Sequence, residues 1–403
     1  MNNIMKNQKT LAYHDQCIIP TEQENKELAA LSNNKMSHLL KKCALKKSEI
    51  SLENLHEHLR VAMTLELSTI PPYLCALYSI EVGDSTKADY QQNYGDNAEV
   101  ARLIRSVMME EMLHFTLVGN ILNAVRGEIK INHKDYVPEY PTVLPDSAGQ
   151  FMVHLSKFDQ SSIKTFLQIE QPTPAGTVPK LDEYETIGQF YHAIQDLMQA
   201  LEEEAREKGE TIFKGNEVYQ IDAKFYYGGG GEIIAVNNLK SAKAAIKIIL
   251  EQGEGSEHSI YDTDKQEFEQ INEISHYFKF NEIYEQQRYA SCQVDPKVPP
   301  QGTRMDIKHH KVYNMGINPK TENFVSADLK NLSHQFNLLY RELLDGLQKA
   351  FTGNKDEFLS SVCQMYQLRY KAVELMRNPI PGKRVNAGPT FEFLSDQEIK
   401  DMK

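Results

Sequence analysis

The sequence has few cysteines and no long hydrophobic run, and both absences exclude whole classes of protein. No stretch among the 403 residues approaches the roughly 20 apolar residues that span a bilayer, and the first 20 residues lack the apolar core of a secretory signal. The five cysteines are scattered and form no CxxC pair, which argues against a disulfide framework. We therefore expect a cytoplasmic protein with reduced thiols and no membrane partner.

Long basic runs are also missing. The chain has 44 Lys and Arg residues against 56 Asp and Glu residues, which gives a formal net charge of −12. Such a chain is not expected to bind nucleic acid or an anionic membrane. What is present is the composition of an ordinary globular protein, because 41% hydrophobic and 25% charged residues are enough for a large core.

Apolar residues recur at alternating steps of three and four along several stretches, which predicts long amphipathic helices. We expect bundle helices at about 51–82, 97–126, 160–208 and 264–288, and outer helices at about 240–252 and 326–377. Pro71 and Pro72 fall inside the first helix, so a kink or break is expected just after Glu66. The predicted fold class is mostly α, a four-helix bundle with additional helices and long irregular crossovers.

The other segments are polar or irregular. Residues 1–48 are predicted to be a polar N-terminal extension, residues 49–393 the helical domain and residues 394–403 a tail. The stretch 128–158 is rich in Pro and Tyr, and we expect it to cover the site as a lid. A short strand pair is expected around 225–236, flanking four consecutive glycines that lack the spacing of a phosphate-binding loop.

Ionisable residues occupy inward positions of the predicted helices, where Leu or Val would be ordinary. Glu111 and His114 lie three residues apart on one face of the second helix, and Glu66 takes the matching inward position on the first. A buried carboxylate beside an imidazole is costly unless it is paired or binds a metal. Glu110 lies off this face, so we expect it to contact solvent or to support a neighbouring ligand.

The Glu-x-x-His spacing recurs at Glu273 and His276, in the predicted 264–288 helix. One such pair is common by chance and usually marks a solvated face. Two pairs together with Glu66, however, are typical of bundles that bind two iron or manganese ions. Bridging carboxylates with one imidazole per ion favour Fe or Mn over Zn, which prefers thiolates.

A bundle site of this kind normally takes a carboxylate from one more helix. Our preferred candidate is Glu170, at the end of the helical stretch 160–170. Its rival is the polar face of the next helix, whose members otherwise face solvent: Glu185, Gln189, His192 and Asp196. The predicted metal ligands are therefore Glu66, Glu111, His114, Glu170, Glu273 and His276.

Several of these stretches resemble the ferritin-like domain of iminophenyl-pyruvate dimer synthases, which occurs in enzymes of violacein and chromopyrrolate biosynthesis. The matching segments are Leu65-Glu-Leu-Ser-Thr-Ile-Pro-Pro-Tyr73, Glu110-Glu-Met-Leu-His114, Phe166-Leu-Gln-Ile-Glu170, Gln252-Gly-Glu-Gly255, Ser275-His-Tyr-Phe278 and Ala387-Gly-Pro-Thr-Phe391. The resemblance runs from about residue 50 to 393. It implies a ferritin-like bundle that binds metal through the residues above. The named enzymes oxidatively couple two imines derived from aromatic amino acids, and they are much longer than this chain.

We therefore expect a metal-dependent oxidoreductase of secondary metabolism. In it, two iron ions would activate O₂ or peroxide toward a small aromatic or amino-acid-derived substrate. Oxidative coupling of imines is one such reaction. Manganese, a mixed Fe/Mn pair and haem, with which one family member is associated, are the alternative cofactors. The alternative functions are a non-catalytic metal-binding or iron-handling protein and a bundle whose site has decayed. We expect a monomer or a homodimer.

Overall fold

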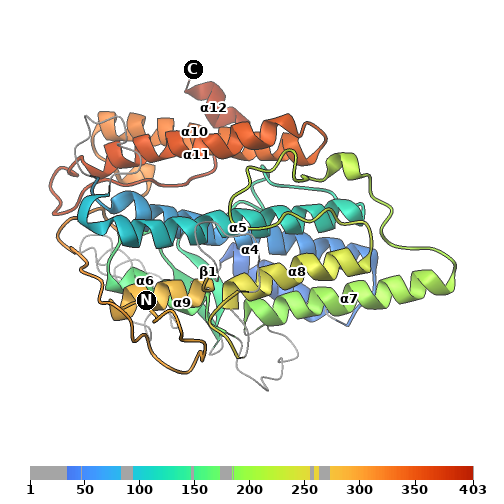
Figure 1. Cartoon of the computed structure of the whole chain (residues 1–403). Coiled ribbons are helices and arrows are strands. Elements are labelled where there is room, and N and C mark those ends of the chain that lie inside the picture. The colour runs from blue at the N-terminus through green and yellow to red at the C-terminus, as the bar shows by residue number, and fades with distance from the viewer. Residues whose placement is uncertain are drawn as a thin grey trace, which may run out of the picture.

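The computed structural model describes residues 34–46, 48–82, 94–146, 149–172, 184, 186–254, 258–262 and 273–402. Over these residues the protein is mostly helical, as predicted (Figure 1). The helices are α3 (Lys35–Lys46), α4 (Leu52–Ser79), α5 (Ala98–Ala124), α6 (Gln160–Ile169), α7 (Ile187–Glu207), α8 (Leu239–Glu254), α9 (His276–Glu285), α10 (Ala327–Phe351), α11 (Asp356–Met376) and α12 (Asp396–Asp401). None of them combines the length and the apolar character that crossing a membrane requires.

The two long helices α4 and α5 pack along each other and form the middle of the molecule (Figure 1). Ser51 begins α4, because its side chain accepts a hydrogen bond from the backbone N–H of Asn54. In α5, every residue from 110 to 124 is buried. The central helix therefore has no solvated face in this region, unlike an ordinary amphipathic helix.

The predicted break in α4 is wrong, because the helix continues through Pro71 and Pro72. Proline removes one helical hydrogen bond and leaves the carbonyl four residues earlier without its N–H partner. For Pro72 that carbonyl belongs to Ser68, and the hydroxyl of Tyr140 donates to it over 2.8 Å. A side chain from a distant loop thus takes the place of the missing donor.

A second layer packs against this pair and is made of interrupted helices. The stretch predicted at 160–208 consists of two helices, α6 and α7, and the first of them ends at about residue 170 as expected. The predicted helix at 264–288 is the short α9, which begins only at His276. Residues 263–272 lie outside the described part of the chain. Helix α8, expected on the outside, contacts α5, α7 and α9 through a stripe of small and branched residues that includes Ala245 and Ile249. The four helices α6, α7, α8 and α9 therefore face the continuous pair α4 and α5.

The third layer is the hairpin of α10 and α11, which lies on the opposite side of the central pair in Figure 1. The predicted outer helices at 326–377 are thereby confirmed. Hydrogen bonds join this layer to the centre: the hydroxyl of Tyr78 donates to the carbonyl of Met365, and the amide of Asn123 donates to the carbonyl of Phe351. Part of the predicted N-terminal extension forms α3, which buries Met36 and Leu40 against the body. The predicted tail contains α12.

The strands are not where the sequence placed them. No strand forms at 225–236, whereas the stretch 128–158, expected to be irregular, contains the antiparallel pair β1 (Thr142–Asp146) and β2 (Gly149–Val153). In the region 225–236 the chain bonds instead to side chains of the bundle: Asn120 donates to the carbonyl of Ile234, and Gln252 donates to the carbonyl of Gly230. These contacts use the backbone groups that a strand ladder would need.

Candidate metal centre

The candidate centre lies where the interrupted helices of the second layer end against α4 and α5. Glu170 caps the C-terminus of α6, and His276 is the first residue of α9. Glu66 projects from α4, while Glu111 and His114 project from α5. All five side chains are buried, with at most 6% of any residue exposed. The fold thus brings together five of the six predicted ligands.

Glu111 lies between the two imidazoles. Its Oε1 is 3.0 Å from Nδ1 of His276 and 3.8 Å from Nδ1 of His114. Nδ1 of His276 is also 3.4 Å from Oε2 of Glu170, and Nδ1 of His114 is 3.6 Å from Oε2 of Glu66. The rings stack with their centroids 5.3 Å apart. One donor atom each from Glu111, His114 and His276 lie within 4.8 Å of one another, which is compatible with shared coordination of a cation.

The Nε2 atom of each imidazole lies close to a polar residue outside this set. Nε2 of His276 is 2.7 Å from Oε2 of Glu110, and Nε2 of His114 is 2.9 Å from Oε1 of Gln252. With a proton on Nε2 in each ring, both Nδ1 lone pairs point into the cluster of carboxylates. This is the arrangement in which histidine ligates metals with an oriented ring.

The outer oxygens of the three carboxylates also have donors. The hydroxyl of Tyr191 donates to Glu66, that of Tyr73 donates to Glu170, and Oγ1 of Thr69 donates to Oε2 of Glu111 over 2.7 Å. No pattern in the sequence singles out Tyr73 and Tyr191 among the 20 tyrosines. They fix the orientation of each carboxylate, so that one oxygen of each is directed toward the imidazoles.

Burial governs the protonation of the cluster. Burial raises the pKa of Glu66 to about 7, and burial together with the Glu111 carboxylate raises the pKa of Glu170. Burial lowers the pKa of His114. Burial also opposes a charge on His276, but the carboxylates around it, Glu170 foremost, raise its pKa well above the ordinary value. The site therefore favours positive charge at its centre, which divalent cations supply.

The prediction that Glu273 is a ligand is not supported by its position. Glu273 precedes α9 instead of lying on it, so it does not share a helix face with His276. Its Oε1 is 2.7 Å from Nζ of Lys279, and Ile274 forms a bridge with Tyr261 in an extended segment. Successive side chains of an extended backbone point to opposite sides. A spacing of three residues therefore does not place Glu273 and His276 on the same side.

Glu110 is not solvated, contrary to one of the two readings of the sequence. It is 1% exposed, and both of its oxygens accept hydrogen bonds of 2.7 Å from the buried Nζ of Lys279. Burial opposes the charge on Glu110, but Lys279 and His276 hold the pKa of Glu110 at about 2. Glu110 is therefore a charged partner of His276 rather than a surface acid.

On the rival face of the next helix, the ionisable residues that the structure describes do not contact the centre. His192 and Asp196 are exposed, as the solvent-facing interpretation predicts. Gln189 is buried, and Glu185 lies outside the described residues. Glu170 thus remains the carboxylate of this layer that contacts His276.

The four consecutive glycines at 228–231 allow the chain to touch the backbone of α5 beside the centre. Gly230 has φ +80°, and a Cβ there would lie 2.9 Å from the carbonyl oxygen of Met109 and 3.0 Å from Cα of Glu110. Its carbonyl accepts from Gln252, the partner of His114. The predicted flexible turn is therefore a close packing contact that supports both imidazole partners.

We expect Gly230→Ala to destabilise the protein by about 1–3 kcal/mol more than Gly228→Ala. Both glycines have positive φ, so both substitutions carry similar backbone strain, but a Cβ at Gly228 meets nothing within 4 Å. The extra loss comes from forcing a methyl group against backbone that cannot yield. Thermal unfolding of the two variants measures the difference. Equal midpoints would show that the close approach is unimportant.

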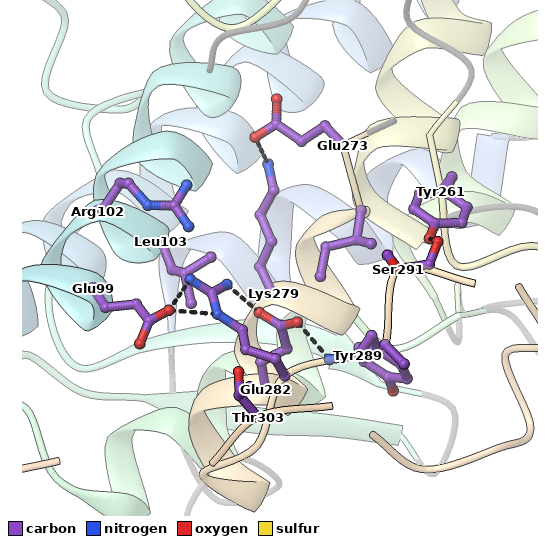
Figure 2. Close-up of a pocket in the computed structure, with 13 residues that line it drawn as sticks. Glu99, Arg102, Leu103, Tyr261, Glu273, Lys279, Glu282, Tyr289, Ser291 and Thr303 are labelled. Atoms are coloured by element: carbon purple, nitrogen blue, oxygen red, sulfur yellow. Dashed lines mark hydrogen bonds and ion pairs between the residues drawn. The ribbon is translucent and has the colours of Figure 1, made fainter. Parts of the chain in front are cut away.

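Two pockets adjoin the centre. A small cavity of about 30 Å³ is lined by four of the five candidate ligands, and a larger pocket of about 510 Å³ lies between the first turns of α5, α9 and the segment around 288–291 (Figure 2). Lys279 lines the larger pocket and reaches Glu110 behind it. Among the residues of 128–158 that the structure describes, none lines either pocket, so these residues do not form the lid that we expected over the site.

The comparisons with known proteins agree with the fold. A model of the Ferritin-like family matches residues 59–285, more than half of the chain, and that range contains all five candidate ligands. The chain is also similar to the crystal structure of a ferritin-like protein from Caulobacter vibrioides, with a TM-score of 0.54 and 22% identity. That match covers 85% of this chain and 99% of the other.

One curated enzyme is similar in sequence. Dichlorochromopyrrolate synthase from Lentzea aerocolonigenes is 25% identical to this chain in an alignment of 383 residues. The match covers 83% of this chain and 35% of the enzyme. The chain thus spans about a third of the length of this relative. The relative is a chromopyrrolate-type biosynthetic enzyme, in agreement with the resemblance found in the motifs.

Proposed function

The chain belongs to the ferritin-like family, and from that premise we propose that it is a metal-dependent oxidoreductase that uses two iron ions and O₂. The observation that carries the proposal is the buried set of three carboxylates and two imidazoles, directed toward one another from four helices or helix ends. The identity of the metal and the number of ions are part of this proposal. Its ligands are Glu66, Glu111, His114, Glu170 and His276.

The residues present fit such a metal group. Carboxylate oxygens and imidazole nitrogens, without thiolates, are the donors that iron and manganese take in helical bundles. Three buried carboxylates are costly as anions unless cations neutralise them, and burial already raises the pKa of Glu66 and of Glu170. Glu111 lies near both histidines, so it would contribute to holding an ion beside either imidazole.

Iron bound at this site supplies the electrons that the reduction of O₂ requires. The chain itself supplies orientation and exclusion of water. Tyr73, Tyr191 and Thr69 hold the outer carboxylate oxygens, which limits how far the ligands can rotate. The cavity beside the ligands is about 30 Å³, so there is room for a diatomic molecule or a water but not for an organic substrate.

We further propose that an organic substrate occupies the pocket of about 510 Å³, a volume usual for small-molecule sites. Figure 2 shows aromatic surface from Tyr261 and Tyr289 on one side of this pocket and the guanidinium of Arg102 on the other. These groups suit a small aromatic molecule that carries a carboxylate, such as one derived from an amino acid. The similarity to a chromopyrrolate-type synthase supports this substrate class.

Anaerobic loading with Fe(II), followed by exposure to O₂, tests the proposal. We expect O₂ uptake in step with loss of chelatable Fe(II), and we expect both to disappear in Glu111→Gln. Glu202→Gln is the matched control, since Glu202 is equally buried but lies toward the far end of α7, where it accepts bonds from Thr211 and Arg206. Oxidation at the same rate in both variants would contradict the proposal.

A further inference from the structure

The two histidines of the centre are held by different kinds of partner. Nε2 of His276 faces the carboxylate of Glu110 at 2.7 Å, whereas Nε2 of His114 bonds to the carboxamide oxygen of Gln252 at 2.9 Å. Glu110 and Gln252 are both buried, at 1% and 2% exposure, so neither partner is readily exchanged for water. The two imidazoles therefore have different environments, one beside a carboxylate and one beside a carboxamide.

Each partner is itself fixed by a contact from another element. Glu110 accepts two hydrogen bonds of 2.7 Å from Lys279, one turn after His276 on α9. Gln252 donates from its amide nitrogen to the carbonyl of Gly230 over 2.8 Å, which leaves its oxygen to face His114. The orientation of the carboxamide is thereby defined, and its oxygen is the atom directed at the ring.

An imidazole whose N–H faces a carboxylate is a stronger metal ligand than one whose N–H faces a neutral carboxamide. The carboxylate stabilises the positive charge that the ring gains when it binds a metal. Partners of this kind typically change metal affinity by about 10- to 100-fold. From these contacts we infer that the two metal positions are unequal: the ion on His276 binds more tightly than the ion on His114. Glu110 and Gln252 act as positioning residues, each for one position. This inference rests on the proposed function, since it assumes two bound ions.

Titration of the full-length, metal-free protein with Co²⁺ under anaerobic conditions, followed by its visible absorption, tests the inference. We expect two binding steps in the wild-type protein, separated by about 10- to 100-fold in affinity. In Glu110→Gln the tighter step should weaken by a similar factor while the weaker step stays in place. In Gln252→Met the weaker step alone should move.

The design separates a positioning role from a general loss of structure. A variant that merely loosens the bundle weakens both steps together, and the wild-type titration does not depend on any variant folding. Glu202→Gln should leave both steps unchanged. Two steps of equal affinity, a single bound ion, or variants that each shift both steps would overturn the inference. Absence of any Co²⁺ binding would instead overturn the proposed function.

Discussion

Replacing Glu111 by Ala is expected to reduce the bound metal from two ions per chain to fewer than one and to lower iron-dependent O₂ uptake at least about 100-fold. Glu111 is the carboxylate that contacts both imidazoles, at 3.0 Å from His276 and 3.8 Å from His114, so its loss affects both metal positions at once. Its neighbours cannot replace it, because Glu66 and Glu170 each lie beside one histidine. Elemental analysis after loading and desalting measures the effect.

The same substitution separates a metal site from a decayed one. A decayed site keeps a buried acid without a cation, so removing Glu111 would stabilise the metal-free protein and change no metal content. Glu202→Ala serves as a control for loss of a buried carboxylate elsewhere. If Glu111→Ala bound as much metal as the wild-type protein, Glu111 would not be a ligand.

Replacing Lys279 by Met is expected to cost about 3–5 kcal/mol, because it breaks a fully buried ion pair and leaves Glu110 without its main counter-charge. Lys279 is 1% exposed, and its Nζ lies 2.7 Å from carboxylate oxygens of both Glu110 and Glu273. For a chain of this size the thermal midpoint should fall by about 4–6 °C. The measurement is made with a chelator present, so that bound metal does not contribute.

A surface pair of the same chemistry provides the control. Lys42 is 2.8 Å from Glu57, but the side chain of Lys42 is 55% exposed, so Lys42→Met should cost less than about 1 kcal/mol. Combining Lys279→Met with Glu110→Gln should restore part of the loss, because the remaining group is then neutral. Equal midpoints for Lys279→Met and Lys42→Met would rule out an important buried pair.

The helices could be predicted because their apolar periodicity is long and regular. The central helices α4 and α5 and the hairpin of α10 and α11 lie within a few residues of their predicted bounds. The end of α6 could also be predicted, since Pro172 and the turn residues after it stop the helical pattern at about residue 170. The late start of α9 was harder to foresee, because it depends on contacts with other elements and the polar pattern of a short helix resembles that of an extended segment.

The ligands were recognisable for a similar reason. Glu66, Glu111 and His114 stand at positions of two long helices where apolar residues are expected, and such positions can be read from one chain. Of the two roles expected for Glu110, contact with solvent is wrong, because that expectation assumes one buried face whereas residues 110–124 of α5 are all buried. Lys279 and Gln252 were missed because their importance depends on which side chains the fold places opposite them.

Metal binding by the five buried residues is tested most directly by counting iron ions in the wild-type protein. The protein is loaded anaerobically with excess Fe(II), freed of unbound metal and analysed for iron and protein. We expect close to two ions per chain, held by Glu66, Glu111, His114, Glu170 and His276. Fewer than one ion per chain would contradict the proposal and would leave the cluster as a buried network of hydrogen bonds and ion pairs.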